Sequence, residues 1–189
     1  MQEKRDIWKR IQKGLDVSKL RFLDESSVNC GMTRLYGRAP TNERVNDYVP
    51  DVRFERTSII SALGLDGITA PIMFKGTLNG DFFAGYVEYA LAPALSPGDI
   101  LVLDNYSPHK ANGVLDPVYE KDATVMFLPE YSPDLNPVEP MWSKVKSSLR
   151  KLKPRTPDEL IEAMCQSLDS VTYNDIVGWF ENYGYSVNV

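Results

Sequence analysis

Two runs of consecutive apolar residues limit most strongly what this chain can fold into. Ile-Leu-Val-Leu occupies residues 100–103, and Ala-Thr-Val-Met-Phe-Leu-Pro follows at residues 123–129. Unbroken apolar runs of this length indicate strands buried on both faces, because a half-exposed strand alternates apolar and polar residues. A short helix is predicted between them, across residues 112–122. The run at residues 100–103 in particular predicts a parallel strand.

The other elements follow from periodicity and from turn residues. Further strands are predicted at residues 19–29, 32–39, 56–67 and 70–76, with an exposed polar connection at 41–55. Helices are predicted at residues 3–15, 79–95, 137–152, 157–170 and 173–183. Strands come first, strands and helices then alternate, and helices end the chain. This order predicts one α/β domain with a mixed β-sheet flanked by α-helices.

Two aspartates lie where such sheets usually carry their sites. Asp104 directly follows the buried strand at residues 100–103, and Asp24 lies in or at the end of the first strand. In open α/β sheets, ligands bind near the carboxyl ends of strands. Both aspartates are therefore candidate site residues.

A stiff segment precedes a third carboxylate. Residues 129–137, here called the elbow, contain three prolines, and Glu139 follows. Asn136 is predicted to cap the next helix with Pro137 in its first turn, which would place Glu139 at the third helical position. One interpretation is a capping box; the other is a carboxylate held rigidly as a metal ligand. Glu130 and Asp134 are rival carboxylates, interpreted as solvated loop acids.

Composition narrows the kind of metal and partner. One histidine and two cysteines exclude two-histidine zinc sites and a disulfide scaffold, so oxygen ligands and Mg²⁺ or Mn²⁺ are favoured. The net charge of −5 argues against a permanent nucleic-acid coat but leaves a nuclease open. No apolar run approaches the roughly 20 residues of a membrane helix, and no secretion signal is recognised, so no membrane partner is expected.

Basic residues follow Glu139 without any acid from residue 143 to 155. They predict contacts to DNA phosphates that read no sequence. The alternative is the solvated face of an amphipathic helix. The candidate DNA-binding residues are Lys144, Lys146, Arg150, Lys151 and Lys153.

Several segments together resemble the DDE transposases of the bacterial insertion-sequence branch of the mariner superfamily. They are LRFLDESSVNCGMTRLYGRAP, ISALGLDGITAPIMFKGTLNGDFF, LVLDNYSPHK, VMFLPEYSPDLNPVEPMWSKVKSSLR and GWFENYGY. The resemblance covers residues 18–185, with the blocks in the family's order. It implies a ribonuclease H-like fold.

The resemblance also implies the site and its chemistry. Asp24, Asp104 and Glu139 match the catalytic triad, and 34 residues separate the second and third acids, as in this branch. They would bind two Mg²⁺ or Mn²⁺ ions; water would cleave transposon ends, and the freed 3′-hydroxyl would attack target DNA. Asn105 and His109 match family positions next to the metal site. Their alternatives are a strand-ending turn residue and a structural histidine.

The resemblance implies the organisation and location as well. Residues 1–189 are expected to form one catalytic domain that lacks the family's N-terminal helix-turn-helix module. The chain is then expected to be either a catalytic fragment or one half of a split element, with that module on a separate chain. A homodimer on DNA is expected, in the bacterial cytoplasm and at the nucleoid. Two other functions remain: a catalytically impaired remnant that binds DNA or protein, and a ribonuclease H-like nuclease acting on RNA or hybrid.

Overall fold

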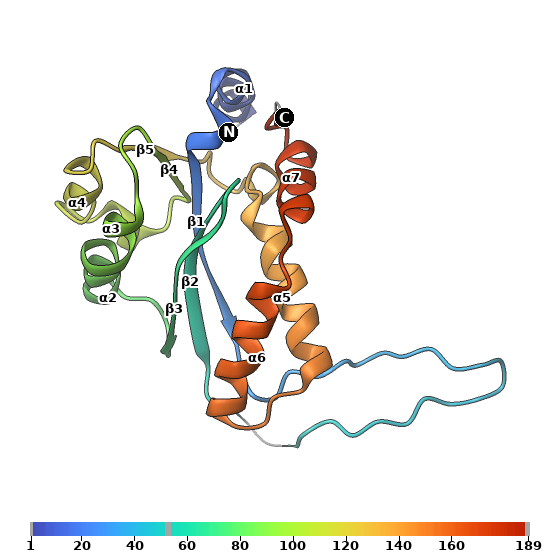
Figure 1. Cartoon of the computed structure of the whole chain (residues 1–189). Helices are drawn as coiled ribbons and strands as arrows, with labels where there is room; N and C mark the ends of the chain where they lie inside the picture. The colour runs from blue at the N-terminus through green and yellow to red at the C-terminus, as the bar shows by residue number, and fades with distance from the viewer. Residues whose placement is uncertain (1, 52–53, 188–189) are drawn as a thin grey trace.

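A five-stranded mixed sheet forms the centre of the computed structural model, which describes residues 2–51 and 54–187. The strands lie in the order β3-β2-β1-β4-β5 (Figure 1). Their bounds are β1 Leu20–Val28, β2 Thr57–Gly64, β3 Gly67–Lys75, β4 Ile100–Leu103 and β5 Thr124–Phe127. β1 pairs antiparallel with β2 and parallel with β4, and β4 pairs parallel with β5. The predicted mixed sheet and its parallel strands are confirmed.

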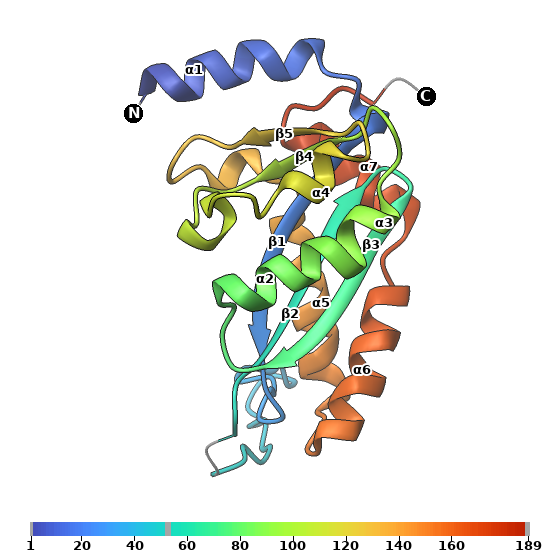
Figure 2. The ribbon, with the colours of Figure 1, turned by 90° about the vertical axis from the view of Figure 1, so that its left-hand side faces the viewer.

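Helices cover both faces of the sheet. Their bounds are α1 Gln2–Ile11, α2 Gly80–Tyr86, α3 Ala92–Ala94, α4 Asp116–Tyr119, α5 Val138–Leu152, α6 Pro157–Asp169 and α7 Tyr173–Asn182. A π-helical turn at Val87–Leu91 joins α2 to α3. The helices α5, α6 and α7 cover one face, α2 to α4 lie on the other, and α1 lies across the end of the sheet near β5 (Figures 1 and 2). No helix in the described part of the chain is long and apolar enough to span a membrane.

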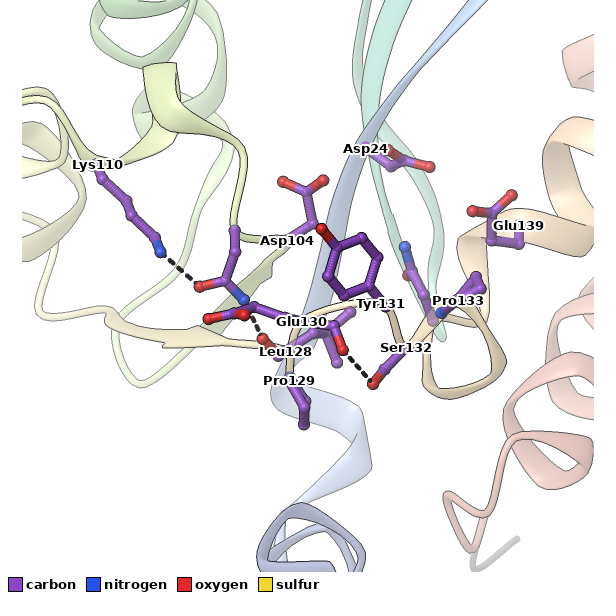
Figure 3. Close-up of a pocket in the computed structure, with 12 residues that line it drawn as sticks. Asp24, Asp104, Lys110, Leu128, Pro129, Glu130, Tyr131, Ser132, Pro133 and Glu139 are labelled. Carbon is purple, nitrogen blue, oxygen red and sulfur yellow. Dashed lines mark hydrogen bonds between the residues drawn. The ribbon is translucent and has the colours of Figure 1, made fainter. Parts of the chain in front are cut away.

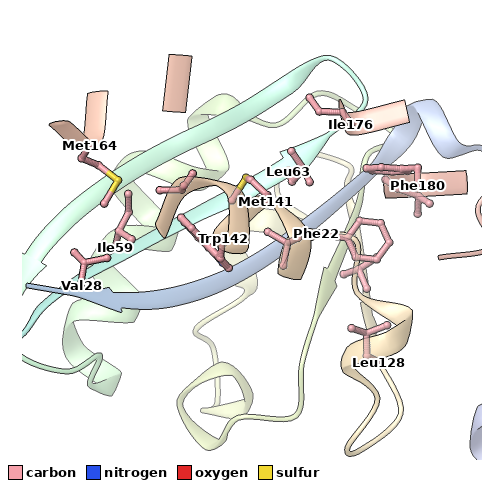
Figure 4. Packing of buried hydrophobic residues seen from close by; sticks show 14 of the residues in the cluster. Phe22, Val28, Ile59, Leu63, Leu128, Met141, Trp142, Met164, Ile176 and Phe180 are labelled. Atoms are coloured by element: carbon pink, nitrogen blue, oxygen red, sulfur yellow. The ribbon is translucent and has the colours of Figure 1, made fainter. Parts of the chain in front are cut away.

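Alternation along β1 divides its side chains between two apolar cores. Phe22 packs in the core under α5 and α7, where it meets Phe180 edge-on, with ring centroids 5.5 Å apart (Figure 4). Leu23 lies in the other core with Phe83 of α2. Because neighbouring residues of a strand face opposite ways, Asp24 shares the α5 face with Phe22.

Two predictions for the strands are wrong. Residues 32–39 form no strand; they belong to a long loop that projects from the body, where Leu35 and Tyr36 are 69% and 91% exposed (Figure 1). Their alternating pattern finds no partner strand, and a strand is stable only with a ladder to join. β5 was expected to be fully buried, yet it is only partly covered, because it forms the edge of the sheet.

The remaining predicted elements agree with the structure within a few residues. The connection at residues 41–55 is irregular, and it is exposed apart from the partly buried Pro50 and Phe54. Positions 52 and 53 lie outside the described residues. The helices at the carboxyl end have capping boxes at their starts, formed by Thr156 with Glu159 and by Thr172 with Asp175. Such caps satisfy the free N–H groups of the first helical turn, so local sequence sets these boundaries.

Candidate active site

A pocket of about 480 Å³ opens beside the middle of β1 and the carboxyl end of β4 (Figure 3). Asp24 from β1, Asp104 after β4 and Glu139 from the first turn of α5 stand around this opening. The other lining residues are Asn105, Lys110, Leu128, Pro129, Glu130, Tyr131, Ser132, Pro133 and Asn136. Three carboxylates that are far apart in the sequence therefore share one pocket.

Strand register explains why the two aspartates meet. Phe22 of β1 pairs with Val102 of β4 in the parallel ladder. Two residues further along each chain come Asp24 and Asp104, so alternation directs both toward the same face. Adjacent strands lie about 4.8 Å apart, which brings the two aspartates into one neighbourhood.

The start of α5 differs from the predicted one by a residue. The helix begins at Val138, and Pro137 is the N-cap residue without a side-chain capping bond. The Asn136 side chain accepts a 3.4 Å hydrogen bond from the Val138 N–H instead. The capping-box interpretation of Glu139 is wrong, because its exposed side chain makes no hydrogen bond to any described residue. Its carboxylate lies in the first turn of the helix and lines the pocket.

Asp104 is held in its ionised form. His109 Nδ1 lies 2.8 Å from Asp104 Oδ1, and the Tyr106 N–H donates to the same oxygen at 2.9 Å. Partial burial alone would raise the pKa of Asp104, but these two hydrogen bonds outweigh it and lower the pKa below its ordinary value. An ionised carboxylate only accepts, so Nδ1 of the buried His109 carries a proton. This is the position next to the site that was predicted for His109.

Asp24 has the opposite electrostatic setting. Burial raises the pKa of Asp24 well above its ordinary value, and the charges of Glu25 and Glu139 raise it further. Asp104 adds a smaller repulsion. Lys110 is the one cationic side chain on the described pocket wall, and its ammonium bonds Asn105 Oδ1 at 2.5 Å. The pocket thus holds an excess of negative charge without a matching cation.

This charge excess fits divalent cations. Carboxylate oxygens are the donors that Mg²⁺ and Mn²⁺ prefer, and Asp24, Asp104 and Glu139 would hold them. Within the described residues, however, no three His, Cys, Asp or Glu side chains are already gathered closely enough to hold a metal ion. The three acids therefore share one pocket, but their side chains are not yet close enough together to coordinate one metal ion.

Asp24→Asn is expected to stabilise the protein when EDTA removes divalent ions. The change removes a buried charge that its neighbours repel, and we expect a gain on the order of 1 kcal/mol, or roughly 3 °C in the midpoint of thermal unfolding. Because the folded-state pKa is raised, the wild type loses stability as pH rises from about 4 through that pKa. The stability difference should therefore grow over that pH range in thermal melts.

The matched control for this experiment is Asp51→Asn, which removes the same charge from an exposed loop residue. It should leave the thermal midpoint unchanged at every pH. A thermal midpoint of Asp24→Asn equal to or below that of the wild type would contradict the described electrostatics of the pocket.

Asn105 connects the end of β4 to the elbow. Its side-chain N–H₂ donates to the Leu128 carbonyl, and its oxygen accepts from Lys110. It lines the pocket next to Asp104. Of the rival acids, Glu130 lies on the pocket wall, whereas Asp134 pairs with Arg5 of α1. The contact between α1 and the elbow was not predicted, and no local pattern in the sequence indicates it.

The predicted DNA-binding residues have different settings. Lys144 forms an ion pair with Asp175, and Lys153 forms one with Asp47 at 2.5 Å. Lys146, Arg150 and Lys151 form no ion pair with any described residue, and Lys151 borders a shallow groove between α5 and α7. The last three therefore remain available for phosphate contacts, while the first two help to hold the fold.

Comparisons with known proteins agree with this fold. A family model described as DDE superfamily endonuclease matches residues 19–161. No curated protein matches the sequence significantly. Among solved structures, the Mos1 transposase paired-end complex with left transposon end has a TM-score of 0.77 and 16% identity, covering 96% of this chain and 57% of that one.

A second structure covers the catalytic part alone. The catalytic domain of Mos1 mariner transposase has a TM-score of 0.67 and 16% identity, with 96% of this chain and 87% of that chain covered. The Mos1 chains in the paired-end complexes are longer, and this chain spans little more than half of their length. In the complex with Mn, the matched part is 57% of the Mos1 chain. The similarity confirms the predicted ribonuclease H-like fold.

Proposed function

The chain belongs to the DDE superfamily of endonucleases, and on this premise we propose that it is the metal-dependent catalytic domain of a DNA transposase. It hydrolyses phosphodiester bonds at transposon ends and transfers the freed 3′-hydroxyl to target DNA. One observation carries the proposal: Asp24, Asp104 and Glu139 come from three distant segments to the wall of one pocket.

The catalytic roles follow from the setting of each acid. When bound, two Mg²⁺ or Mn²⁺ ions activate the attacking oxygen and stabilise the leaving oxygen. Asp104, kept ionised by His109 and the Tyr106 N–H, supplies a ready anionic ligand. Asp24 supplies a buried carboxylate that repels its anionic neighbours, and Glu139 supplies an exposed one. Similar Mos1 paired-end complexes with Mn and with Mg support this choice of ions.

The proposed branch of the mariner superfamily rests on the sequence motifs. Glutamate at the third position and the 34-residue spacing support the bacterial insertion-sequence branch of the mariner superfamily. We assign the protein to the bacterial cytoplasm, at the nucleoid when it is bound to DNA.

The proposed partners are transposon ends and target DNA. Lys146, Arg150 and Lys151 would contact phosphates along α5, on the helix that carries Glu139. The Mos1 structure with left transposon end supports DNA as the partner. A homodimer on DNA completes the proposed assembly.

Nicking of supercoiled plasmid tests the proposed function. The purified chain should nick duplex DNA with Mg²⁺ or Mn²⁺, and EDTA should stop the reaction. A substrate panel under the same metals should show preference for duplex DNA over an RNA–DNA hybrid. Preference for the hybrid would favour a general ribonuclease H-like nuclease, and DNA binding without any nicking would favour the impaired remnant.

A further inference from the structure

The helix α1 is joined to the elbow by charge-assisted hydrogen bonds. Arg5 Nη1 donates to Ser132 Oγ at 2.8 Å and to Asp134 Oδ1 at 2.9 Å, while Nη2 donates to Asp134 Oδ2 at 2.5 Å. Only 18% of the Arg5 side chain is exposed, and Ser132 is buried. Planar, two-pronged contacts of this kind combine strength with fixed geometry.

A second, buried connection reaches the same loop. Trp8 Nε1 donates to the Tyr185 hydroxyl at 3.1 Å, and that hydroxyl donates to the Leu135 carbonyl at 2.8 Å. Trp8 and Tyr185 are both buried. The helix α1 thus contacts the elbow directly through Arg5, and it reaches Leu135 through Tyr185. Lys4 of α1 adds an exposed ion pair with Glu130.

The elbow has little internal structure to hold its shape. Its own backbone bonds join Leu135 N–H to Ser132 and Asn136 N–H to Pro133, within a single 3₁₀ turn. Tyr131 has a φ of +53°, a left-handed conformation that costs a non-glycine residue on the order of 1 kcal/mol. Such a conformation persists only when surrounding contacts enforce it.

The elbow, which α1 and Tyr185 contact, forms part of the pocket wall. Tyr131, Ser132 and Pro133 line the pocket, and the elbow leads directly into the helical turn that carries Glu139. A shift of the elbow would therefore change both the shape of the wall and the direction of the Glu139 carboxylate (Figure 3).

We propose that Arg5 is a positioning residue: through Ser132 and Asp134 it fixes the elbow, and through the elbow it sets Glu139 against Asp24 and Asp104. α1 is then part of the working active site, although it contributes no residue that touches the substrate. The effect on catalysis rests on the proposed function, whereas the effect on the elbow does not.

Arg5→Met tests the inference because methionine keeps the apolar stem but removes the donors. Amide hydrogen exchange at Leu135 and Asn136, whose N–H groups donate hydrogen bonds within the elbow, should become about tenfold faster. Hydrogen bonds to charged groups typically stabilise a structure by enough for that factor. The free energy of global unfolding, measured in urea, should fall by no more than the same tenfold factor, about 1.4 kcal/mol. In the nicking assay, kcat should fall about tenfold while KM for DNA stays constant.

Two further variants complete the test. Arg10→Met removes an arginine of the same helix whose side-chain hydrogen bond stays within α1, at the Asp6 carbonyl, so elbow exchange and nicking should not change. Arg5→Asp combined with Asp134→Arg should restore slow exchange relative to Arg5→Asp alone. Unchanged exchange at Leu135 and Asn136 in Arg5→Met would overturn the proposal. If the wild type nicks no DNA, the transposase function fails, and exchange still decides the role of Arg5.

Discussion

Asp104→Asn is expected to lower the rate of plasmid nicking by at least about 10³-fold, which corresponds to roughly 4 kcal/mol of transition-state stabilisation. Asparagine has nearly the same shape and keeps an oxygen that accepts from the Tyr106 N–H and from His109. The folded structure should therefore survive. What is lost is the negative charge at the carboxyl end of β4, which the proposed cations require. The rates are measured with Mg²⁺ and again with Mn²⁺.

The control for this prediction is Glu130→Gln. Glu130 lies on the same pocket wall and its exposed carboxylate pairs only with Lys4, at 3.5 Å. Its removal should change nicking less than about threefold, because exposed ion pairs contribute little. If Asp104→Asn keeps most of the activity, or if Glu130→Gln loses as much, the assignment of the triad is wrong.

Arg21→Met is expected to reduce the free energy of unfolding by about 3–5 kcal/mol, the usual cost of leaving a buried charge without its partner. Arg21 Nε lies 3.3 Å from Asp99 Oδ2, and the two side chains are 9% and 1% exposed. The guanidinium also pairs with Asp66 in the turn between β2 and β3. Gly64 leaves the space this group needs, because a Cβ there would clash with Arg21 Nη1.

Urea denaturation measures this loss, which should lower the midpoint by roughly 1–2 M. Lys75→Met is the matched control, since Lys75 pairs with Glu55 at 3.8 Å and both side chains are more than four-fifths exposed. We expect its free energy of unfolding to change by less than about 0.5 kcal/mol. Similar losses in the two variants would show that burial does not govern the Arg21 contribution.

Much of the secondary structure could be predicted because its causes are local. The buried strand at residues 100–103 and the capped helix that starts after Thr156 each follow from a few neighbouring residues. The strand predicted at residues 32–39 is wrong because that prediction also used only the local pattern. Its pattern suits a strand, but only a neighbouring strand can provide the ladder, and none of the described strands lies beside it.

The candidate site was predictable in part. Asp24, Asp104 and Glu139 were identified from strand ends, a stiff loop and family motifs, and the structure places all three on one pocket wall. The ion pairs of Lys144 and Lys153 were not predictable, since their partners lie 31 and 106 residues away. The hydrogen bonds from Arg5 to Ser132 and Asp134 were equally unpredictable, since these partners lie 127 and 129 residues away in the sequence.

Most elements, their order and the chemical types of the site residues were predictable from local patterns, since periods of 2 and 3.6 residues, caps and prolines act over short distances. The folded arrangement places Asp24 beside Asp104 and α1 against the elbow, and it leaves some lysines free of ion pairs among the described residues. These arrangements depend on strand register and on the packing of distant surfaces. Neither is encoded in the spacing of neighbouring residues.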